Sequence, residues 1–201
     1  MRLFLKAISY LFHPLFIPIA GTVAYFLITP KYSTVEIQSG NLLPIFILTV
    51  IIPTISYLIL RNLGMVKTVN LTDLKERRYP LYISILLLLM VVYKVIPNNF
   101  TIELHYYFIG LIAATFATLL LLFLNFKSSL HLTGMGSLLM YLICLSVHFE
   151  INITLALSLV ILITGLVATS RIYLRSHTNA ELLIGFSIGI LSQLLTVKYW
   201  L

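Results

Sequence analysis

The sequence predicts an all-α, polytopic bundle of six to seven transmembrane helices, and three observations support this fold class. Of the 201 residues, 60% are hydrophobic and only 9% are charged, and the mean hydropathy is +1.06. A soluble domain carries about 25% charged residues. Apolar runs of about 20 residues, the length that crosses a bilayer, recur along the chain. The few charged residues gather between these runs, so we expect one integral membrane domain over residues 1–201.

Seven apolar runs are long enough to be candidate spans. The first follows Arg2 and Lys6, as the apolar core of a signal peptide would, but it is too long for a cleaved segment, and we interpret it as a retained span. His13, Pro14 and Pro18 predict a kink in this span or its partial insertion, which gives the range of six to seven. The candidate spans are residues 7–29, 42–60, 80–97, 104–126, 132–149, 151–169 and 178–197.

Seven spans divide the charged residues unequally between the two membrane faces. One face holds the N-terminus and the connections at about 61–79, 127–131 and 170–177, and the other holds the remaining connections and the C-terminus. A cytoplasmic location of the more basic face would follow from the positive-inside rule. Cations retained for phosphate binding would produce the same asymmetry, so the orientation stays open. The basic residues are Arg2, Lys6, Arg61, Lys67, Lys75, Arg77, Arg78, Lys127, Arg171 and Arg175 on the first face, and Lys31, Lys94 and Lys198 on the second.

Three polar segments belong to the more basic face. They are the charged sequence 73–80, in which Pro80 is expected to start a helix, the sequence 127–131, which ends in His131, and the segment 170–181. Their basic residues lie at the ends of apolar runs. We therefore expect them to bind phosphate or anionic lipid headgroups rather than nucleic acid.

The segment 170–181 has the composition of a phosphoryl-transfer site. Arg171 precedes His177 by six residues, and Glu181 follows it by four, where a carboxylate on the next helical turn reaches an imidazole. Ionisable side chains clustered between apolar runs of a membrane protein indicate a functional site. A cation, a nucleophile or base, and an orienting acid are the parts that phosphoryl transfer needs. With His131 as a second histidine and a single acidic partner, no metal is required, because a two-metal mechanism needs several carboxylates.

These residues resemble the signatures of the type 2 phosphatidic acid phosphatase superfamily. Ser170-Arg171, His177 and Glu181 are spaced as in its third signature, Ser-Arg-x5-His-x3-Asp, with Glu in place of Asp. Ser129 and His131 match part of the second signature, Pro-Ser-Gly-His, in which Leu130 replaces the glycine. The first signature, Lys-x6-Arg-Pro, is similar to Lys75, Arg77 or Arg78, and Pro80, with altered spacing. The resemblance covers roughly residues 73–190.

The resemblance implies an all-helical membrane bundle with its active site at the membrane interface. It implies that His177 is the nucleophile and forms a phosphohistidine, that Glu181 orients it, and that His131 protonates the leaving group. The phosphate-binding residues that it implies are Arg171, Lys75, Arg77, Arg78 and Ser129.

We therefore expect a metal-independent lipid phosphatase without a cofactor. Its substrate would be a lipid phosphomonoester or diphosphate, such as phosphatidate, phosphatidylglycerophosphate, a polyprenyl diphosphate or a lipid A phosphate. The expected partners are this lipid and the bilayer, with no nucleic acid, and the expected location is a bacterial cytoplasmic membrane. The sequence does not decide the oligomeric state, the lipid or the face that carries the site.

Simpler interpretations of the same residues stay open. Thr178 and Glu181 fit a capping box at the start of the last span. The charged sequence 73–78 is also typical of a solvated loop, and Arg171 of a topology anchor. The alternatives for the whole protein are a non-catalytic lipid-binding or scaffold protein and a small anion transporter. Transporters often contain paired half-repeats, which this sequence does not show.

Overall fold

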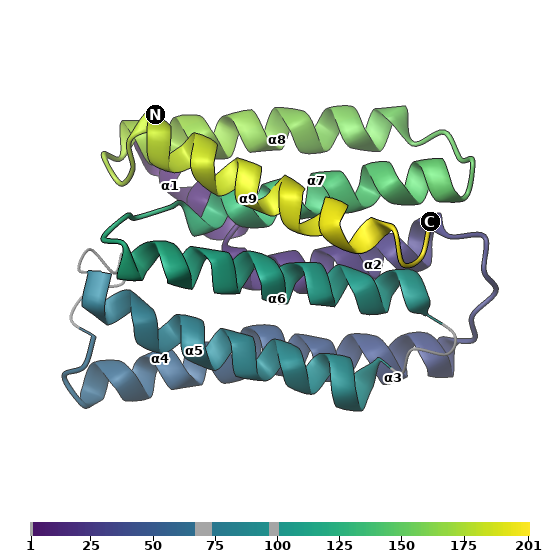
Figure 1. The fold of residues 1–201 in the computed structure, drawn as a ribbon, viewed down its shortest axis with the longest axis horizontal. Coiled ribbons are helices and arrows are strands. Elements are labelled where there is room, and N and C mark those ends of the chain that lie inside the picture. The colour runs from purple at the N-terminus through teal and green to yellow at the C-terminus, as the bar shows by residue number, and fades with distance from the viewer. Residues whose placement is uncertain (1, 67–73, 97–100) are drawn as a thin grey trace.

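The computed structural model describes residues 2–66, 74–96 and 101–201, which form helices and connecting turns without a strand (Figure 1). The first elements are α1 (Arg2–Leu11), the 3-10 turn η1 (Pro14–Phe16), α2 (Ile17–Ile28) and α3 (Val35–Phe46). Helix α3 continues through the π turn η2 (Ile47–Ile51) into α4 (Ile52–Asn62), and α5 (Leu74–Met90) continues through the π turn η3 (Val91–Val95). The remaining helices are α6 (Ile102–Phe123), α7 (Leu130–His148), α8 (Thr154–Tyr173) and α9 (Asn179–Val197).

Within the described residues, seven helical stretches are long and apolar enough to cross a membrane, so the all-helical integral membrane fold is confirmed. The second begins at Val35, before the predicted residue 42, because Thr34 caps it by accepting a hydrogen bond from the Ile37 amide at 3.4 Å. The prediction that Pro80 starts a helix is wrong, because Pro80 lies inside α5. The charged residues before it extend the helix, and a proline within the second turn removes only one backbone hydrogen bond.

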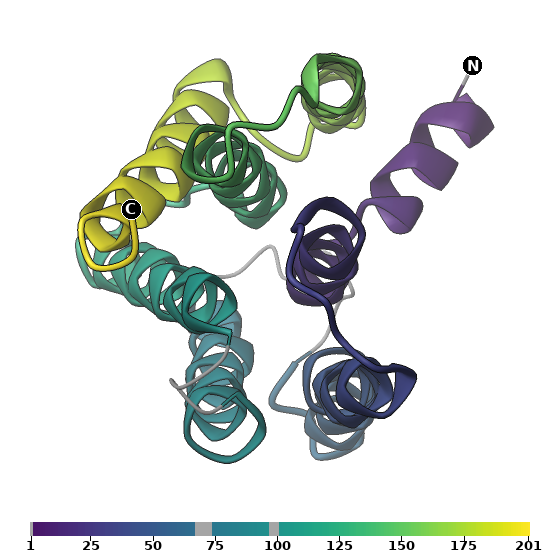
Figure 2. The ribbon, with the colours of Figure 1, turned by 90° about the vertical axis from the view of Figure 1, so that its right-hand side faces the viewer.

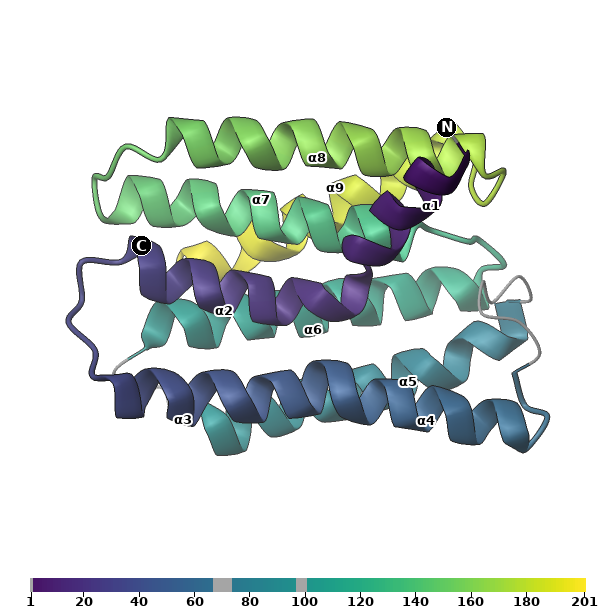
Figure 3. The ribbon, with the colours of Figure 1, turned by 180° about the vertical axis from the view of Figure 1, so that it is seen from behind.

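The first span is broken at the predicted position. His13 has an extended backbone (φ −67°, ψ 142°), as expected before a proline, and its Nδ1 accepts a hydrogen bond from the Leu15 amide at 3.4 Å. Helix α1 therefore leaves the axis of α2 and packs against α8 instead (Figures 2 and 3). The break divides the apolar stretch Arg2–Ile28 into two helices of 10 and 12 residues with different directions.

A second irregularity lies opposite this break. Pro53 has no amide hydrogen to donate, and the π turn η2 comes immediately before α4, in whose first turn Pro53 lies. The Thr49 hydroxyl satisfies a neighbouring backbone group by donating to the Ile45 carbonyl at 2.8 Å. The widened turn places Thr49 and Val50 on the wall of an internal cavity.

Helix α7 is the most buried of the seven spans and packs most closely against α9. Small residues permit this approach, as at many interfaces between membrane helices. A Cβ added at Gly185 of α9 would lie 2.7 Å from the Ser129 carbonyl oxygen, and one at Gly136 of α7 would lie 2.5 Å from the Phe186 carbonyl oxygen. The glycines therefore bring the start of α9 against the start of α7.

The seven spans place the more basic segments at one end of the bundle, as span parity predicts. Helix α1, the end of α4, the start of α5, the α6–α7 connection and the α8–α9 connection lie together at the left of Figure 1. The C-terminus and the α2–α3 and α7–α8 connections lie at the opposite end. Lys67 and Asp73 of the basic face lie outside the described residues.

Candidate active site

His177 and Glu181 are in direct contact. The His177 Nδ1 lies 2.6 Å from the Glu181 Oε2, and the two side chains are 1% and 19% exposed. A carboxylate oxygen only accepts, so Nδ1 carries the hydrogen and the lone pair remains on Nε2. His177 lies in the connection between α8 and α9 and lines a cavity. A neutral imidazole held in this tautomer has a nitrogen available for attack on phosphorus.

Glu181 also forms the predicted capping box. Thr178 Oγ1 accepts from the Glu181 amide at 3.3 Å, and Glu181 Oε2 accepts from the Thr178 amide at 3.3 Å. The oxygen that binds His177 is therefore itself held by the start of α9. The Glu181 side chain therefore has two roles, because it caps the start of α9 and also orients the His177 ring. The helix end fixes the carboxylate, and the carboxylate fixes the ring.

Two hydrogen bonds join this segment to the α6–α7 connection. The Ser129 amide donates to the Glu181 carbonyl at 3.1 Å, and the Lys127 Nζ donates to the Ser176 carbonyl at 3.1 Å. The sequence 127–131 and the segment 170–181 are thereby brought together. The Ser129 hydroxyl is buried without a hydrogen-bond partner among the described residues, and it does not line the cavity.

The predicted phosphate-binding cations divide into two groups. Arg171, in the last turn of α8, and Arg77, in α5, are buried and line the same cavity as His177. Arg77 Nη1 donates to the Ser128 carbonyl at 3.2 Å. Arg78 instead lies over the Phe123 ring at 4.6 Å, and Lys75 is exposed; neither lines the cavity. The structure thus brings together two of the four predicted cations.

His131 lines the cavity and is buried, and its contacts involve the N-terminal helix. Its Nε2 lies 3.1 Å from the Ser9 carbonyl oxygen and therefore donates to it. Arg171 Nη1 donates to the Ser9 hydroxyl at 2.8 Å, and the His13 ring meets the His131 ring edge-on at 5.4 Å. Helix α1 thus contacts two predicted site residues. The role of Ser9 was not predicted, because a lone serine in an apolar run has no signal of its own.

Burial and neighbouring charge keep His177 neutral. Burial, followed by Arg77, Lys127 and Arg171, lowers the pKa of His177 to about 3. Burial likewise lowers the pKa of Lys127, with Arg77 adding to the effect and Glu181 opposing it. A nucleophile needs the neutral imidazole, in which Nε2 carries no proton. A phosphate dianion among these cations would offset their repulsion of a proton on His177.

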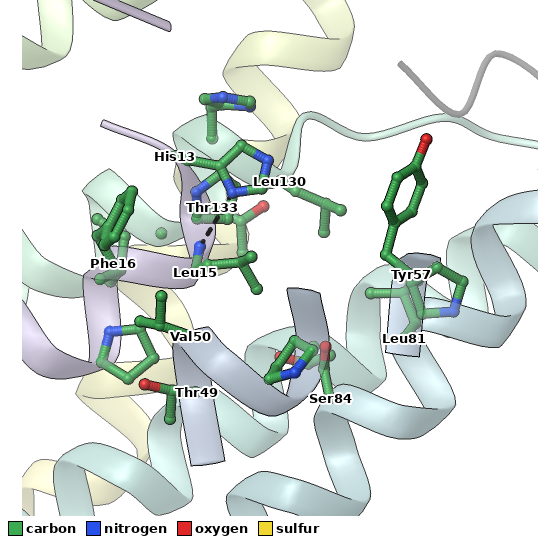
Figure 4. Close-up of a pocket in the computed structure, with 18 of the residues that line it drawn as sticks. His13, Leu15, Phe16, Thr49, Val50, Tyr57, Leu81, Ser84, Leu130 and Thr133 are labelled. Atoms are coloured by element: carbon green, nitrogen blue, oxygen red, sulfur yellow. Dashed lines mark hydrogen bonds between the residues drawn. The ribbon is translucent and has the colours of Figure 1, made fainter. Parts of the chain in front are cut away.

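The cavity has a volume of about 770 Å³ and a polar and an apolar part. Its polar part is lined by His177, Arg77, Arg171, His131 and His13. Its apolar part extends among η2, α5, α6 and α7, and Figure 4 shows it between the broken first span and the second span. The labelled side chains that enclose it include Phe16, Val50, Tyr57, Leu81 and Leu130. This volume lies within the range of about 300–1,000 Å³ that is typical of ligand pockets.

The described residues contain no group of three or more His, Cys, Asp or Glu side chains that could hold a metal ion. The metal-independent reaction stays a prediction. Comparisons with protein-family models, curated proteins and solved structures found no match to this chain.

Proposed function

We propose that this protein is a membrane lipid phosphatase that hydrolyses a lipid phosphomonoester or diphosphate through a phosphohistidine on His177. On this proposal the chain is a divergent member of the type 2 phosphatidic acid phosphatase superfamily. The observation that carries the proposal is the orientation of His177. Glu181 accepts the hydrogen bond from His177 Nδ1. His177 also lines the cavity that Arg77 and Arg171 line.

The reaction would take place in two steps. In the first, Nε2 of His177 attacks phosphorus, the P–N bond forms, and the P–O bond to the leaving group breaks. The leaving oxygen takes a proton from His131, whose protonated ring keeps one N–H on the Ser9 carbonyl and delivers the other. In the second step His131 takes a proton from water as the water oxygen attacks phosphorus, the P–N bond breaks, and inorganic phosphate is released. Arg77 and Arg171 would stabilise the charge on the equatorial oxygens, and Glu181 the imidazolium.

The shape of the cavity supports a lipid substrate. The charged residues lie at the end of the bundle that holds the α6–α7 and α8–α9 connections, and the apolar part extends among the membrane-crossing helices. An amphiphile with a phosphate headgroup matches this division, because its tail stays among apolar side chains while its phosphate meets the cations. Phosphatidate, phosphatidylglycerophosphate, polyprenyl diphosphates and lipid A phosphates are the candidates.

The test is phosphate release by the purified protein from a panel of these four lipids, with EDTA and vanadate in parallel reactions. We expect release from at least one lipid, retention of activity in EDTA, and inhibition by vanadate, which mimics pentacoordinate phosphorus. Substrate labelled in the transferred phosphate should leave an acid-labile, alkali-stable label on the wild type and none on His177→Ala. Inhibition by EDTA or a label that persists in His177→Ala would contradict the mechanism. No release from any lipid would favour a binding or scaffold protein.

A further inference from the structure

One face of helix α1 lines the cavity beside the proposed phosphate site. Arg2, Lys6, Ser9 and Tyr10 lie on one side of α1, His13 follows the end of the helix, and all five line the cavity. The opposite side of α1 is apolar and exposed, as expected for contact with lipid: Phe4 is 59% and Leu11 is 68% exposed. Helix α1 therefore separates the lipid from the polar part of the cavity.

The position of this face is fixed by contacts with the proposed active site. The Ser170 hydroxyl donates to the Leu5 carbonyl at 2.7 Å, and Ser9 accepts from Arg171 through its hydroxyl and from His131 through its carbonyl. The rise of an α-helix places Lys6 about 4.5 Å and Arg2 about 10 Å from Ser9 along the axis. Lys6 is thus one helical turn from the residue that contacts Arg171.

The charge of the cavity exceeds what one phosphate group needs. Four cations line it, namely Arg2, Lys6, Arg77 and Arg171, and no Asp or Glu among the described residues does. Arg77 and Arg171 are the pair beside His177, and they already match a single phosphate dianion. Lys6 and Arg2 extend the positive charge away from His177 along α1, so an anion placed there would be a second one.

We propose that Lys6 and Arg2 form a second anion subsite, and that the substrate carries a second phosphate there. This inference depends on the proposed function and narrows it to lipid diphosphates. The terminal phosphate lies between His177 and the two buried arginines, and the phosphate that bears the lipid lies against α1. Attack by His177 Nε2 breaks the bridging P–O bond, His131 protonates the bridging oxygen, and the products are a lipid monophosphate and, after hydrolysis of the P–N bond, inorganic phosphate.

The first experiment compares farnesyl diphosphate with farnesyl monophosphate, which share one tail, in a neutral detergent. The double variant Arg2→Gln/Lys6→Gln is compared with the wild type and with Arg61→Gln, a control for an exposed cation at the same end of the bundle that does not line the cavity. Charge-assisted hydrogen bonds contribute enough that kcat/KM for the diphosphate should fall about 10- to 100-fold. The monophosphate should change less than about twofold, since it makes no such bond. Equal losses for both substrates, or no loss, would overturn the proposal.

A binding experiment separates this subsite from the proposed reaction. His177→Ala, with its affinity tag at the C-terminus, is titrated with inorganic pyrophosphate and with inorganic phosphate. Pyrophosphate should bind about tenfold more tightly, and the added Arg2→Gln/Lys6→Gln substitutions should remove that preference. If pyrophosphate binds more tightly but the wild type releases no phosphate from any lipid, the proposed phosphatase is disproved and the subsite remains. If the wild type releases phosphate but pyrophosphate binds no more tightly than phosphate, only the subsite is disproved.

A third measurement distinguishes a substrate phosphate from a headgroup of the surrounding membrane. The kinetic comparison is repeated in vesicles of neutral phosphatidylcholine and in vesicles that contain an anionic phospholipid. A substrate subsite predicts the selective loss for the diphosphate in both. A loss that occurs only in anionic vesicles, and equally for both substrates, would show that α1 binds membrane headgroups and would overturn the proposal. Thermal melting of each variant confirms folding.

Discussion

The two ends of the bundle both hold buried ionisable side chains, but their contacts differ. At the end opposite His177, the carboxylate of Glu103 is 1% exposed and accepts from Lys31 at 2.7 Å and from the Tyr25 hydroxyl at 3.1 Å. His148 lies 3.5 Å from the same carboxylate and meets the Trp200 ring at 5.4 Å. This cluster joins α2, α6, α7 and the C-terminal residues, and its charges compensate one another.

At the His177 end, by contrast, cations outnumber carboxylates. Arg77 and Arg171 line the cavity with His177, Glu181 contacts the histidine, and no Asp or Glu of the described residues lines the cavity itself. Buried charge costs free energy unless it is paired. A buried cluster that contains both charges is therefore typical of a role in the fold, whereas a cavity lined by cations and no carboxylate of the described residues is suited to an anionic ligand.

The largest expected effect tests this distinction with two histidines. His177→Ala removes the proposed nucleophile and should lower kcat by at least about 1,000-fold, while the melting temperature stays close to that of the wild type. His148→Ala, at the opposite end, should leave kcat within about twofold and lower the melting temperature instead. Assays of phosphate release and thermal unfolding on the same preparations measure both. The reverse pattern would mean that the two ends have been assigned the wrong roles.

The next effect concerns how α9 positions the site. A methyl group at Gly185 would contact the Ser129 backbone and displace the start of α9, which carries Glu181, from the start of α7. Gly185→Ala should therefore lower kcat/KM about 100-fold, because a displacement of about 1 Å in a catalytic group costs that much.

Gly165→Ala is the matched control for this variant. Gly165 lies in α8 with no atom within 4 Å of an added Cβ, so the substitution should be neutral or stabilise the helix by up to about 1 kcal/mol. Equal activities for Gly185→Ala and Gly165→Ala would show that close packing of α7 on α9 does not position the site.

The sequence alone predicted the parts of this structure that depend on local spacing. Seven spans follow from apolar runs of bilayer length, and the proximity of their polar ends follows from parity. The spacing of four residues between His177 and Glu181 predicted their contact, which is confirmed, although His177 precedes the Thr178 cap and lies outside the helix. The break at His13 was predicted because a proline restricts the residue before it.

Contacts between distant residues were not predictable in this way. Arg171 and Ser9 are separated by 162 positions, and Lys31 and Glu103 by 72, so no periodicity relates them. The choice of Arg77 over Arg78 for the cavity depends on the rotation of α5 about its axis, which the charged sequence leaves undetermined. Lys31 and His148 have the sequence context of interface residues, and the structure assigns them to the Glu103 cluster.

A smaller effect is expected from the compensated cluster. Glu103→Ala leaves Tyr25 without its buried acceptor and removes the carboxylate that pairs with Lys31, so the free energy of unfolding should fall by about 2–3 kcal/mol. Glu103→Gln keeps an acceptor for Tyr25 and should cost less. The activity of the folded fraction should remain within about twofold of the wild type in both. A specific loss of kcat, with stability unchanged, would connect this end to catalysis.

The smallest effect is a shift in pH dependence. The pKa of His177, lowered to about 3 by burial and by Arg77, Lys127 and Arg171, keeps the nucleophile neutral well below the usual pKa of 6.5. The folded protein binds this proton less readily than the unfolded chain does. The stability that the neutral ring confers is therefore complete above about pH 6.5 and is lost as the pH falls towards about 3.

Lys127→Gln removes one of these cations, so the pKa of His177 should rise and the acidic limb of kcat/KM, which reports on the free enzyme, should move to higher pH. Lys198→Gln, at the opposite end, should leave the limb in place and controls for the change in net charge. An acidic limb that moves to lower pH in Lys127→Gln, or moves equally in both variants, would mean that the cations near the cavity do not set the protonation of His177.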